Sequence, residues 1–151
     1  MQTLIILVGL PASGKSTFAE TLKDDNTVVL SSDAIRLELF GDENDQSNNS
    51  LVFTTLYARA KELLQTKNVV IDSTNINREM RAKSLAPFRD MNIQRVAIVF
   101  DTPTEICIER DSMRTRTVGR DVIVRFANLY QRPDVSEGFD KIEYKKLSDN
   151  R

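Results

Sequence analysis

Short apolar segments alternate with amphipathic segments along the chain. Runs of apolar and β-branched residues, which are typical of strands, lie at 3–8, 27–30, 69–71, 96–100 and 139–147. The first run is apolar throughout, as expected for a strand that helices cover on both faces. Helical patterns occupy the intervening segments 15–23, 33–40, 51–65, 78–88, 103–112 and 121–130. This alternation predicts an α/β fold in which a parallel sheet lies between helices.

The same pattern locates helix ends and loops. Asn75 or Asn77 is expected to cap the helix at 78–88, and Pro103 suits the first turn of the next helix. The polar segment 41–49 is short, so we interpret it as a loop within the domain and not as a linker.

Length and charge limit the classes of protein to consider. The 151 residues, of which 40% are hydrophobic and 28% charged, suffice for one globular domain covering 1–151. The 21 basic and 22 acidic residues give a net charge of −1. A protein that coats nucleic acid through a broad basic surface is therefore excluded, and any contact with nucleic acid must be local.

Cysteine and histidine usage narrows the chemistry further. Cys107 is the only cysteine and histidine is absent, which excludes an intramolecular disulfide, a thiolate zinc site and every imidazole-based mechanism. A carboxylate is the natural base if this protein moves a proton. We expect a protein of a reducing compartment, the cytoplasm. The apolar residues at 4–8 lack the basic flank of a signal peptide, and no apolar run is long enough to span a membrane.

A phosphate-binding motif follows the first predicted strand. The residues, which match G-x-x-x-x-G-K-[ST] in full, are Gly9, Leu10, Pro11, Ala12, Ser13, Gly14, Lys15 and Ser16. Its glycines let backbone N–H groups turn toward phosphate oxygens, and the following helix adds its positive N-terminal dipole. We expect Lys15 to reach the β- and γ-phosphates, Ser16 to bind Mg²⁺, and Thr17 to complete the nucleotide site. The sequence thus predicts ATP binding.

An acid and a basic residue follow the second predicted strand. Ligands of open α/β sheets bind beyond the carboxyl ends of the strands, which places Asp33 at the mouth of the cleft. Arg36, three residues later, shares its helix face. The carboxylate would accept a proton from an attacking hydroxyl, and the guanidinium would hold a phosphate of the acceptor. Alternatively, Ser32 or Asp33 serves only as a helix N-cap.

The third predicted strand ends in Asp72. An acid at this position resembles the Walker B carboxylate, which orients Mg²⁺. The predicted metal ligands are therefore Ser16 and Asp72, with a turn-forming role as the alternative for Asp72. Thr74 and Asn75 either line the acceptor site or cap the following helix.

Residues 109–120, here called the lid segment, contain four arginines: Arg110, Arg114, Arg116 and Arg120. Arg110 and Arg114 share a face if the preceding helix continues, and Gly119 offers a hinge. Arginines above a triphosphate neutralise charge as the γ-phosphoryl group leaves. The alternative is a solvated charged loop. Tyr57 and Tyr130 lie at helical spacing, and we interpret them as packing residues.

The order of these motifs resembles the 5′-hydroxyl polynucleotide kinase domain of bacterial and phage end-healing enzymes, a family of P-loop kinases. The resemblance covers nearly the whole chain, and its most specific part is Ser32-Asp33-x-x-Arg36 followed by Asp42-Glu43-Asn44-Asp45-Gln46. It implies a P-loop kinase fold with a parallel sheet in the order 2-3-1-4-5 and an arginine-rich lid. The catalytic residues that it implies are Lys15, Asp33, Arg36 and Arg114.

By the same resemblance, Asp33 is the general base and Arg36 binds a phosphate of the acceptor. Arg110 and Arg114 match lid arginines near the nucleotide, whereas Arg116 and Arg120 match less clearly. The family is commonly fused to a phosphatase or a ligase, but neither an Asp-x-Asp nor a Lys-x-Asp-Gly motif is present. We therefore expect a stand-alone kinase or a domain of a longer chain, with ligase or phosphatase partners supplied separately.

The resulting prediction is an ATP- and Mg²⁺-dependent kinase. It would transfer the γ-phosphate to a 5′-OH end of RNA or DNA, with single-stranded ends preferred because the terminal hydroxyl must enter a cleft. One alternative is a P-loop kinase of a nucleoside, sugar or antibiotic. A second is a non-catalytic NTP-binding module in which Asp33 is only a cap.

Overall fold

The computed structural model describes residues 1–145 and contains a five-stranded parallel sheet in the order β2-β3-β1-β4-β5. The strands are β1 (Thr3–Val8), β2 (Thr27–Ser31), β3 (Asn68–Asp72), β4 (Gln94–Phe100) and β5 (Lys141–Lys145). Both the predicted fold class and the predicted strand order are confirmed.

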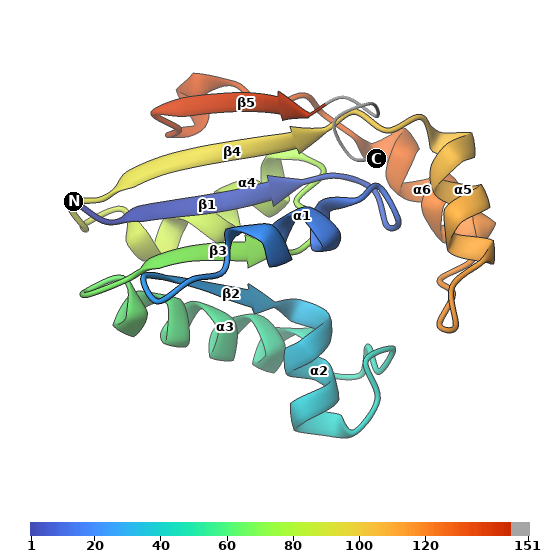
Figure 1. Ribbon diagram of the computed structural model, residues 1–151, viewed down its shortest axis with the longest axis horizontal. Coiled ribbons are helices and arrows are strands. Elements are labelled where there is room, and N and C mark those ends of the chain that lie inside the picture. Colours follow the sequence, from blue (N-terminus) through green and yellow to red (C-terminus); the bar gives the residue numbers. More distant parts are fainter. Residues whose placement is uncertain (146–151) are drawn as a thin grey trace.

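Helices flank the sheet, and some of them extend beyond the carboxyl ends of its strands. They are α1 (Lys15–Leu22), α2 (Ser32–Phe40), α3 (Asn49–Leu63), α4 (Arg78–Leu85), α5 (Thr104–Ser112) and α6 (Arg120–Leu129), with short 3₁₀ helices η1 (Ala86–Phe88) and η2 (Val135–Glu137). In Figure 1 the strands point the same way, and α2, α5 and α6 lie beyond their arrowheads. The carboxyl ends of the strands are therefore the crowded end of the molecule, where the ligands of such sheets bind.

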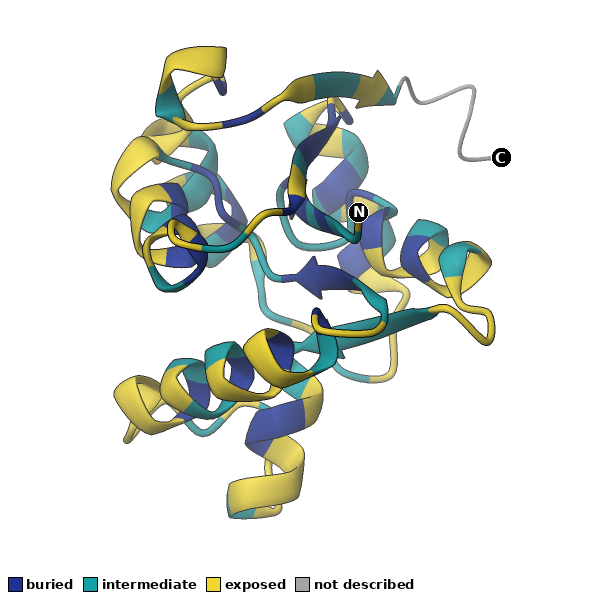
Figure 2. Ribbon diagram, turned by 90° about the vertical axis from the view of Figure 1, so that its left-hand side faces the viewer, coloured by how far each residue is buried: buried dark blue, intermediate teal, exposed yellow. Residues whose placement is uncertain are grey.

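Alternate residues of each central strand face opposite layers. In β1, Leu4, Ile6 and Val8 pack with residues of α3 and α4, whereas Leu7 packs on the other side with Ala19 of α1. Figure 2 shows this burial as dark blue strands and helix faces, with exposed residues on the outer surfaces. Covering on both faces explains why this strand is apolar at almost every position.

The register of the sheet brings distant loops together. Ser31 at the end of β2 pairs with Asp72 at the end of β3. On the other side of β3, the backbone N–H of Gly9 donates to the carbonyl of Thr74 at 3.1 Å. The segments that follow β1, β2 and β3 consequently meet at one edge, with the phosphate-binding loop beside the start of α2.

Some predicted boundaries shift in the structure. The last strand begins at Lys141 and not at residue 139, because Phe139 is buried in the core before the strand starts; positions 146–147 of the predicted strand lie outside the described residues. The helix predicted at 121–130 spans Arg120–Leu129. Tyr130 is therefore an exposed residue at the helix end, and the prediction that it packs in the core is wrong.

The N-terminal caps of α4 and α5 also differ in part from those predicted. Asn77 is the cap of α4, since its Oδ1 accepts a hydrogen bond from the N–H of Met80 at 2.8 Å. Asn75 is instead buried with a φ of 46°. Pro103 lies at the N-cap of α5 and not in its first turn. Within residues 1–145, no helix has the length and apolar character needed to cross a membrane.

Candidate active site

The loop between β1 and α1 forms a concave array of backbone N–H groups. Ala12 and Gly14 have φ values of 62° and 102°, and such left-handed residues among right-handed ones turn successive N–H groups inward. Gly9 permits close packing beneath the loop, because a Cβ there would lie 2.7 Å from Ser13 Oγ. Thr102 Oγ1 donates to the carbonyl of Ser13 at 2.7 Å and ties the loop to the end of β4. The loop is thus preorganised for an anion.

Lys15 is the first residue of α1 and is only 8% exposed. Burial lowers the pKa of its ammonium group, although the carboxylates of Asp72 and Asp33 partly offset this effect. A buried cation is stabilised by a nearby anion. Lys15 therefore favours the binding of a polyphosphate beside the loop.

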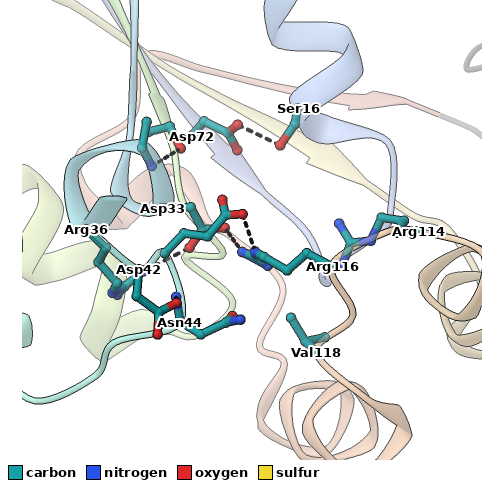
Figure 3. Close-up of polar contacts among 12 residues, drawn as sticks. Ser16, Asp33, Arg36, Asp42, Asn44, Asp72, Arg114, Arg116 and Val118 are labelled. Carbon is teal, nitrogen blue, oxygen red and sulfur yellow. Dashed lines mark hydrogen bonds and ion pairs between the residues drawn. The ribbon is translucent and has the colours of Figure 1, made fainter. Parts of the chain in front are cut away.

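Ser16 and Asp72 form a pair of oxygen ligands at the same place. Ser16 Oγ donates to Asp72 Oδ2 at 2.7 Å, as Figure 3 shows. Hydroxyl and carboxylate oxygens are the ligands that Mg²⁺ prefers, and this ion usually keeps water and phosphate oxygens at its other positions. The two residues therefore fit the predicted role of holding Mg²⁺ next to bound phosphates.

Asp33 lies in the first turn of α2 but does not cap it. Ser31 is the N-cap, and its Oγ accepts a hydrogen bond from the N–H of Ala34 at 3.2 Å. The Asp33 side chain is 49% exposed, and its Oδ1 accepts a hydrogen bond from Arg36 Nη1 at 2.9 Å. The capping alternative for Ser32 or Asp33 is therefore wrong, and the carboxylate remains available for chemistry.

Arg116 links the lid segment to this carboxylate. Arg116 Nη2 donates to Asp33 Oδ2 at 2.7 Å, and its Nε lies 3.0 Å from Glu43 Oε1. Figure 3 shows Arg116 extending from the lid toward Asp33. Sequence patterns did not single out this arginine among the four of the lid. Only the folded chain shows that it reaches both the first turn of α2 and the segment after α2.

The lid segment turns back on itself around a buried acid. Asp111 Oδ1 accepts hydrogen bonds from Arg114 Nη2 at 2.5 Å and from the N–H of Val118 at 3.1 Å, and its Oδ2 accepts one from the N–H of Gly119 at 2.9 Å. Burial alone would raise the pKa of Asp111, but these donors lower it below the ordinary 3.8. Asp111, which no motif indicated, is thus the residue that shapes the lid.

The structure separates the four lid arginines. Arg110 and Arg114 would share a helix face only if the helix continued past them, but α5 ends at Ser112. Both residues nevertheless line the central cavity. Arg116 lines the same cavity. Arg120 lies outside it and pairs with exposed Glu105 at 3.3 Å.

A cavity of about 1450 Å³ runs from the phosphate loop to α3 and α4. Small-molecule sites usually occupy roughly 300–1,000 Å³, so this space suffices for two ligands side by side. The predicted site residues that line it are Pro11, Ala12, Ser13, Gly14, Lys15, Ser16, Thr17, Asp33, Arg36, Asp72, Arg110 and Arg114. Gly9 lies outside the lining, and its contribution is the close packing described above.

The part of the cavity wall formed by the segment after β3 is supported by a buried polar network. Arg81, which is fully buried, donates to the carbonyl of Asn75 at 2.9 Å and pairs with Glu137 at 2.8 Å. Ser84 Oγ donates to Asn75 Oδ1 at 2.7 Å and lies 3.2 Å from the hydroxyl of Tyr57. This network fixes the backbone after β3. Tyr57 also packs against the core, as predicted.

Comparison with known proteins gives one family and several relatives. The family model AAA_33, described as an AAA domain, matches residues 4–133. An L-seryl-tRNA(Sec) kinase from Methanococcus maripaludis is 27% identical over 150 residues, which cover 91% of this chain and 56% of that protein. The chain thus spans about half the length of this relative.

Solved structures share the fold. One chain of the Pnkp1/Rnl/Hen1 RNA repair complex is 28% identical, with a TM-score of 0.74 over 85% of this chain and 43% of that chain. Kti12 from Chaetomium thermophilum, solved with ADP-AlF3, has a TM-score of 0.75 over 97% of this chain and 90% of its own, at 18% identity. The latter likeness concerns the fold alone.

Proposed function

Because this chain belongs to the AAA_33 family of AAA domains, we propose that it is an ATP-dependent P-loop kinase that phosphorylates 5′-hydroxyl ends of RNA or DNA. The observation that carries this proposal is the position of Asp33. Its carboxylate lines the same cavity as the phosphate loop, next to an arginine that is suited to binding an acceptor phosphate. A base, a phosphate donor site and a phosphate-binding cation are thus placed around one space.

In the proposed reaction, Asp33 accepts the proton of the 5′-hydroxyl as the hydroxyl oxygen attacks the γ-phosphorus of ATP. The bond from that phosphorus to the bridging oxygen breaks, and ADP leaves. A carboxylate offers about four lone-pair sites, so the bonds from Arg36 and Arg116 leave room for a hydroxyl to donate. Asp33 therefore orients the nucleophile and takes up its proton.

The charge that develops on the transferred group is met by cations from two elements. Lys15 lies at the phosphate loop, and Arg110 and Arg114 line the cavity from the lid side. Donors fixed in place before the reaction stabilise the transition state without reorganisation. Mg²⁺, held by Ser16 and Asp72, would neutralise the β- and γ-phosphate oxygens.

The acceptor class follows from Arg36 and from the relatives. Arg36 lines the cavity beside Asp33, where a guanidinium can bind the phosphate that follows the terminal nucleoside. Few phosphate contacts are then needed, in agreement with a net charge of −1. Two of the relatives above 25% identity are named for RNA repair and for a tRNA substrate. Both names support a nucleic-acid acceptor, and the RNA repair complex supports the proposal that this chain acts together with partner proteins.

Phosphate transfer from γ-labelled ATP tests the proposal. Matched RNA and DNA oligonucleotides with 5′-OH or 5′-phosphate ends are offered together with Mg²⁺. Single-stranded and blunt duplex forms are included, because the cavity favours a free end. We expect label only on 5′-OH ends, and Asp33→Asn should lower kcat by at least about 10²-fold because the general base is lost.

Asp90→Asn serves as the matched control, because the Asp90 side chain is 77% exposed and its one ion pair among residues 1–145 is with Lys61, at 3.8 Å. It should leave transfer unchanged. Label on no oligonucleotide, with ATP still bound, would overturn the proposal and favour a nucleoside, sugar or antibiotic acceptor. An Asp33→Asn variant as active as the wild type would rule out Asp33 as the base.

A further inference from the structure

Arg36 lines the cavity, and three contacts hold its side chain in place. Its Nη1 donates to Asp33 Oδ1 at 2.9 Å and its Nε donates to Asn49 Oδ1 at 3.1 Å. The Phe53 ring centroid lies 5.9 Å from its Cζ. The residue is only 7% exposed. A side chain held in this way loses little conformational entropy when it binds a ligand.

The contacts of Arg36 leave donors for a ligand. A guanidinium carries five N–H groups, and the bonds to Asp33 and Asn49 use two of them. Within residues 1–145, both N–H groups of Nη2 have no hydrogen-bond partner. Because Arg36 lines the cavity, these donors can bind the oxygen of a phosphate.

Asn49 is itself fixed by a second amide. Its Nδ2 donates to Gln46 Oε1 at 2.8 Å, while its Oδ1 accepts from Arg36. It is the first residue of α3, directly after the Asn48 cap. The amide therefore connects the segment after α2 with the arginine, and each of its two polar atoms has a defined partner.

The partner of Arg36 Nε is a neutral amide, Asn49, and this affects how strongly the guanidinium can attract a phosphate. Arg36 already pairs with one carboxylate, Asp33. A carboxylate at the Nε position would give Arg36 two anionic partners, and the added negative charge would oppose a phosphate, whereas an amide holds the guanidinium in place and adds no negative charge. We infer that Asn49 is a positioning residue for Arg36, and that its neutral side chain makes the site select acceptors with a phosphate next to the nucleoside that bears the reacting hydroxyl. This inference rests on the proposed function.

Steady-state kinetics with two small acceptors test this role. One acceptor is a nucleoside 3′-monophosphate and the other is the same nucleoside without phosphate; both carry the 5′-OH. For Asn49→Ala we expect KM for the phosphorylated acceptor to rise about tenfold, because a hydrogen bond to a charged group is lost. KM for the plain nucleoside and kcat at saturation should stay within about twofold of the wild type.

Asn49→Asp separates positioning from charge. The new carboxylate retains an oxygen for Arg36 Nε, and an acid in the first turn stabilises a helix, so α3 stays intact. We expect a larger rise in KM for the phosphorylated acceptor than in Asn49→Ala. In an Arg36→Ala background, neither substitution at Asn49 should raise that KM further. Asn92→Asp, an exposed position before β4, is the control for charge and should behave as the wild type.

The outcomes distinguish the role of Asn49 from the proposed kinase activity. Unaltered KM for the phosphorylated acceptor, equal changes for both acceptors, or a wild-type-like Asn49→Asp variant would overturn the role of Asn49 while the kinase activity stands. If the wild type phosphorylates neither these acceptors nor a 5′-OH oligonucleotide, the proposed function fails and this inference fails with it.

Discussion

The two sides of the cavity to which we assign the phosphate donor and the acceptor are built in different ways. The donor side consists of consecutive residues from the phosphate loop to α1, with Asp72 as the main distant contribution. The acceptor side joins α2, the start of α3 and the lid, and its contact between Asp33 and Arg116 spans 83 positions. The geometry of the donor side depends mostly on backbone conformation. The geometry of the acceptor side depends on side chains that are distant in the sequence and meet only after folding.

This difference explains why the donor is easier to assign than the acceptor. Backbone N–H groups in a loop of fixed shape recognise phosphate whatever the rest of the chain does. The acceptor site can change when the segment after α2 or the lid changes, without disturbing the sheet. Substitutions on the two sides should therefore have distinct signatures.

The largest effect is expected on the donor side, for Lys15→Met. We propose that Lys15 binds the β- and γ-phosphates, so loss of its charge should lower kcat/KM by about 10³-fold with every acceptor. Because burial lowers the pKa of Lys15, the folded protein carries a cost for this charge, and the free energy of unfolding of the variant should equal or exceed that of the wild type. Transfer assays and urea unfolding of the ligand-free protein measure the two quantities. A variant that is inactive because it is unfolded would contradict this account.

A smaller effect is expected where the two sides meet, for Arg116→Ala. The substitution removes the ion pairs with Asp33 and Glu43, so the lid is no longer held over the acceptor side. The KM values for ATP and for the acceptor should both rise, by roughly tenfold, since positioning is lost without loss of the base. Arg120→Ala is the matched control, because Arg120 pairs with exposed Glu105 outside the cavity. Equal effects of the two substitutions would show that the lid acts only through its net charge.

The smallest effect, on stability, is expected for Asp111→Asn. The pKa of Asp111 is lower in the folded protein than its ordinary 3.8, so the ionised carboxylate stabilises the fold above that pH. This stabilisation is lost as the pH falls through the lower folded-state value. At neutral pH the substitution should cost about 1–2 kcal/mol. Urea unfolding at neutral pH and at low pH should show that the difference between wild type and variant shrinks in acid; a constant difference would contradict the assignment.

Much of the fold was predictable because its signals are local. The apolar runs predicted the strands, since strands covered on both faces must be apolar at nearly every position. The ends of elements were less predictable. Phe139 belongs to the core although it precedes the strand, and Tyr130 is exposed although it continues the helical spacing. In both cases, contacts with distant segments determine where the regular hydrogen bonding begins or stops.

By itself, the sequence determined the phosphate loop, because one contiguous motif contains all the backbone that shapes it. It also indicated Asp33 and Arg36 as the candidate acceptor residues, through their position after a strand. Only the tertiary structure selected Arg116 from the four lid arginines, since that choice depends on how far the lid reaches across the sheet edge. It likewise showed Asn49 beside Arg36 and Asp111 within the lid. These partners are amides, acids and backbone groups without a sequence signature, and their contacts exist only because the chain folds so that they meet.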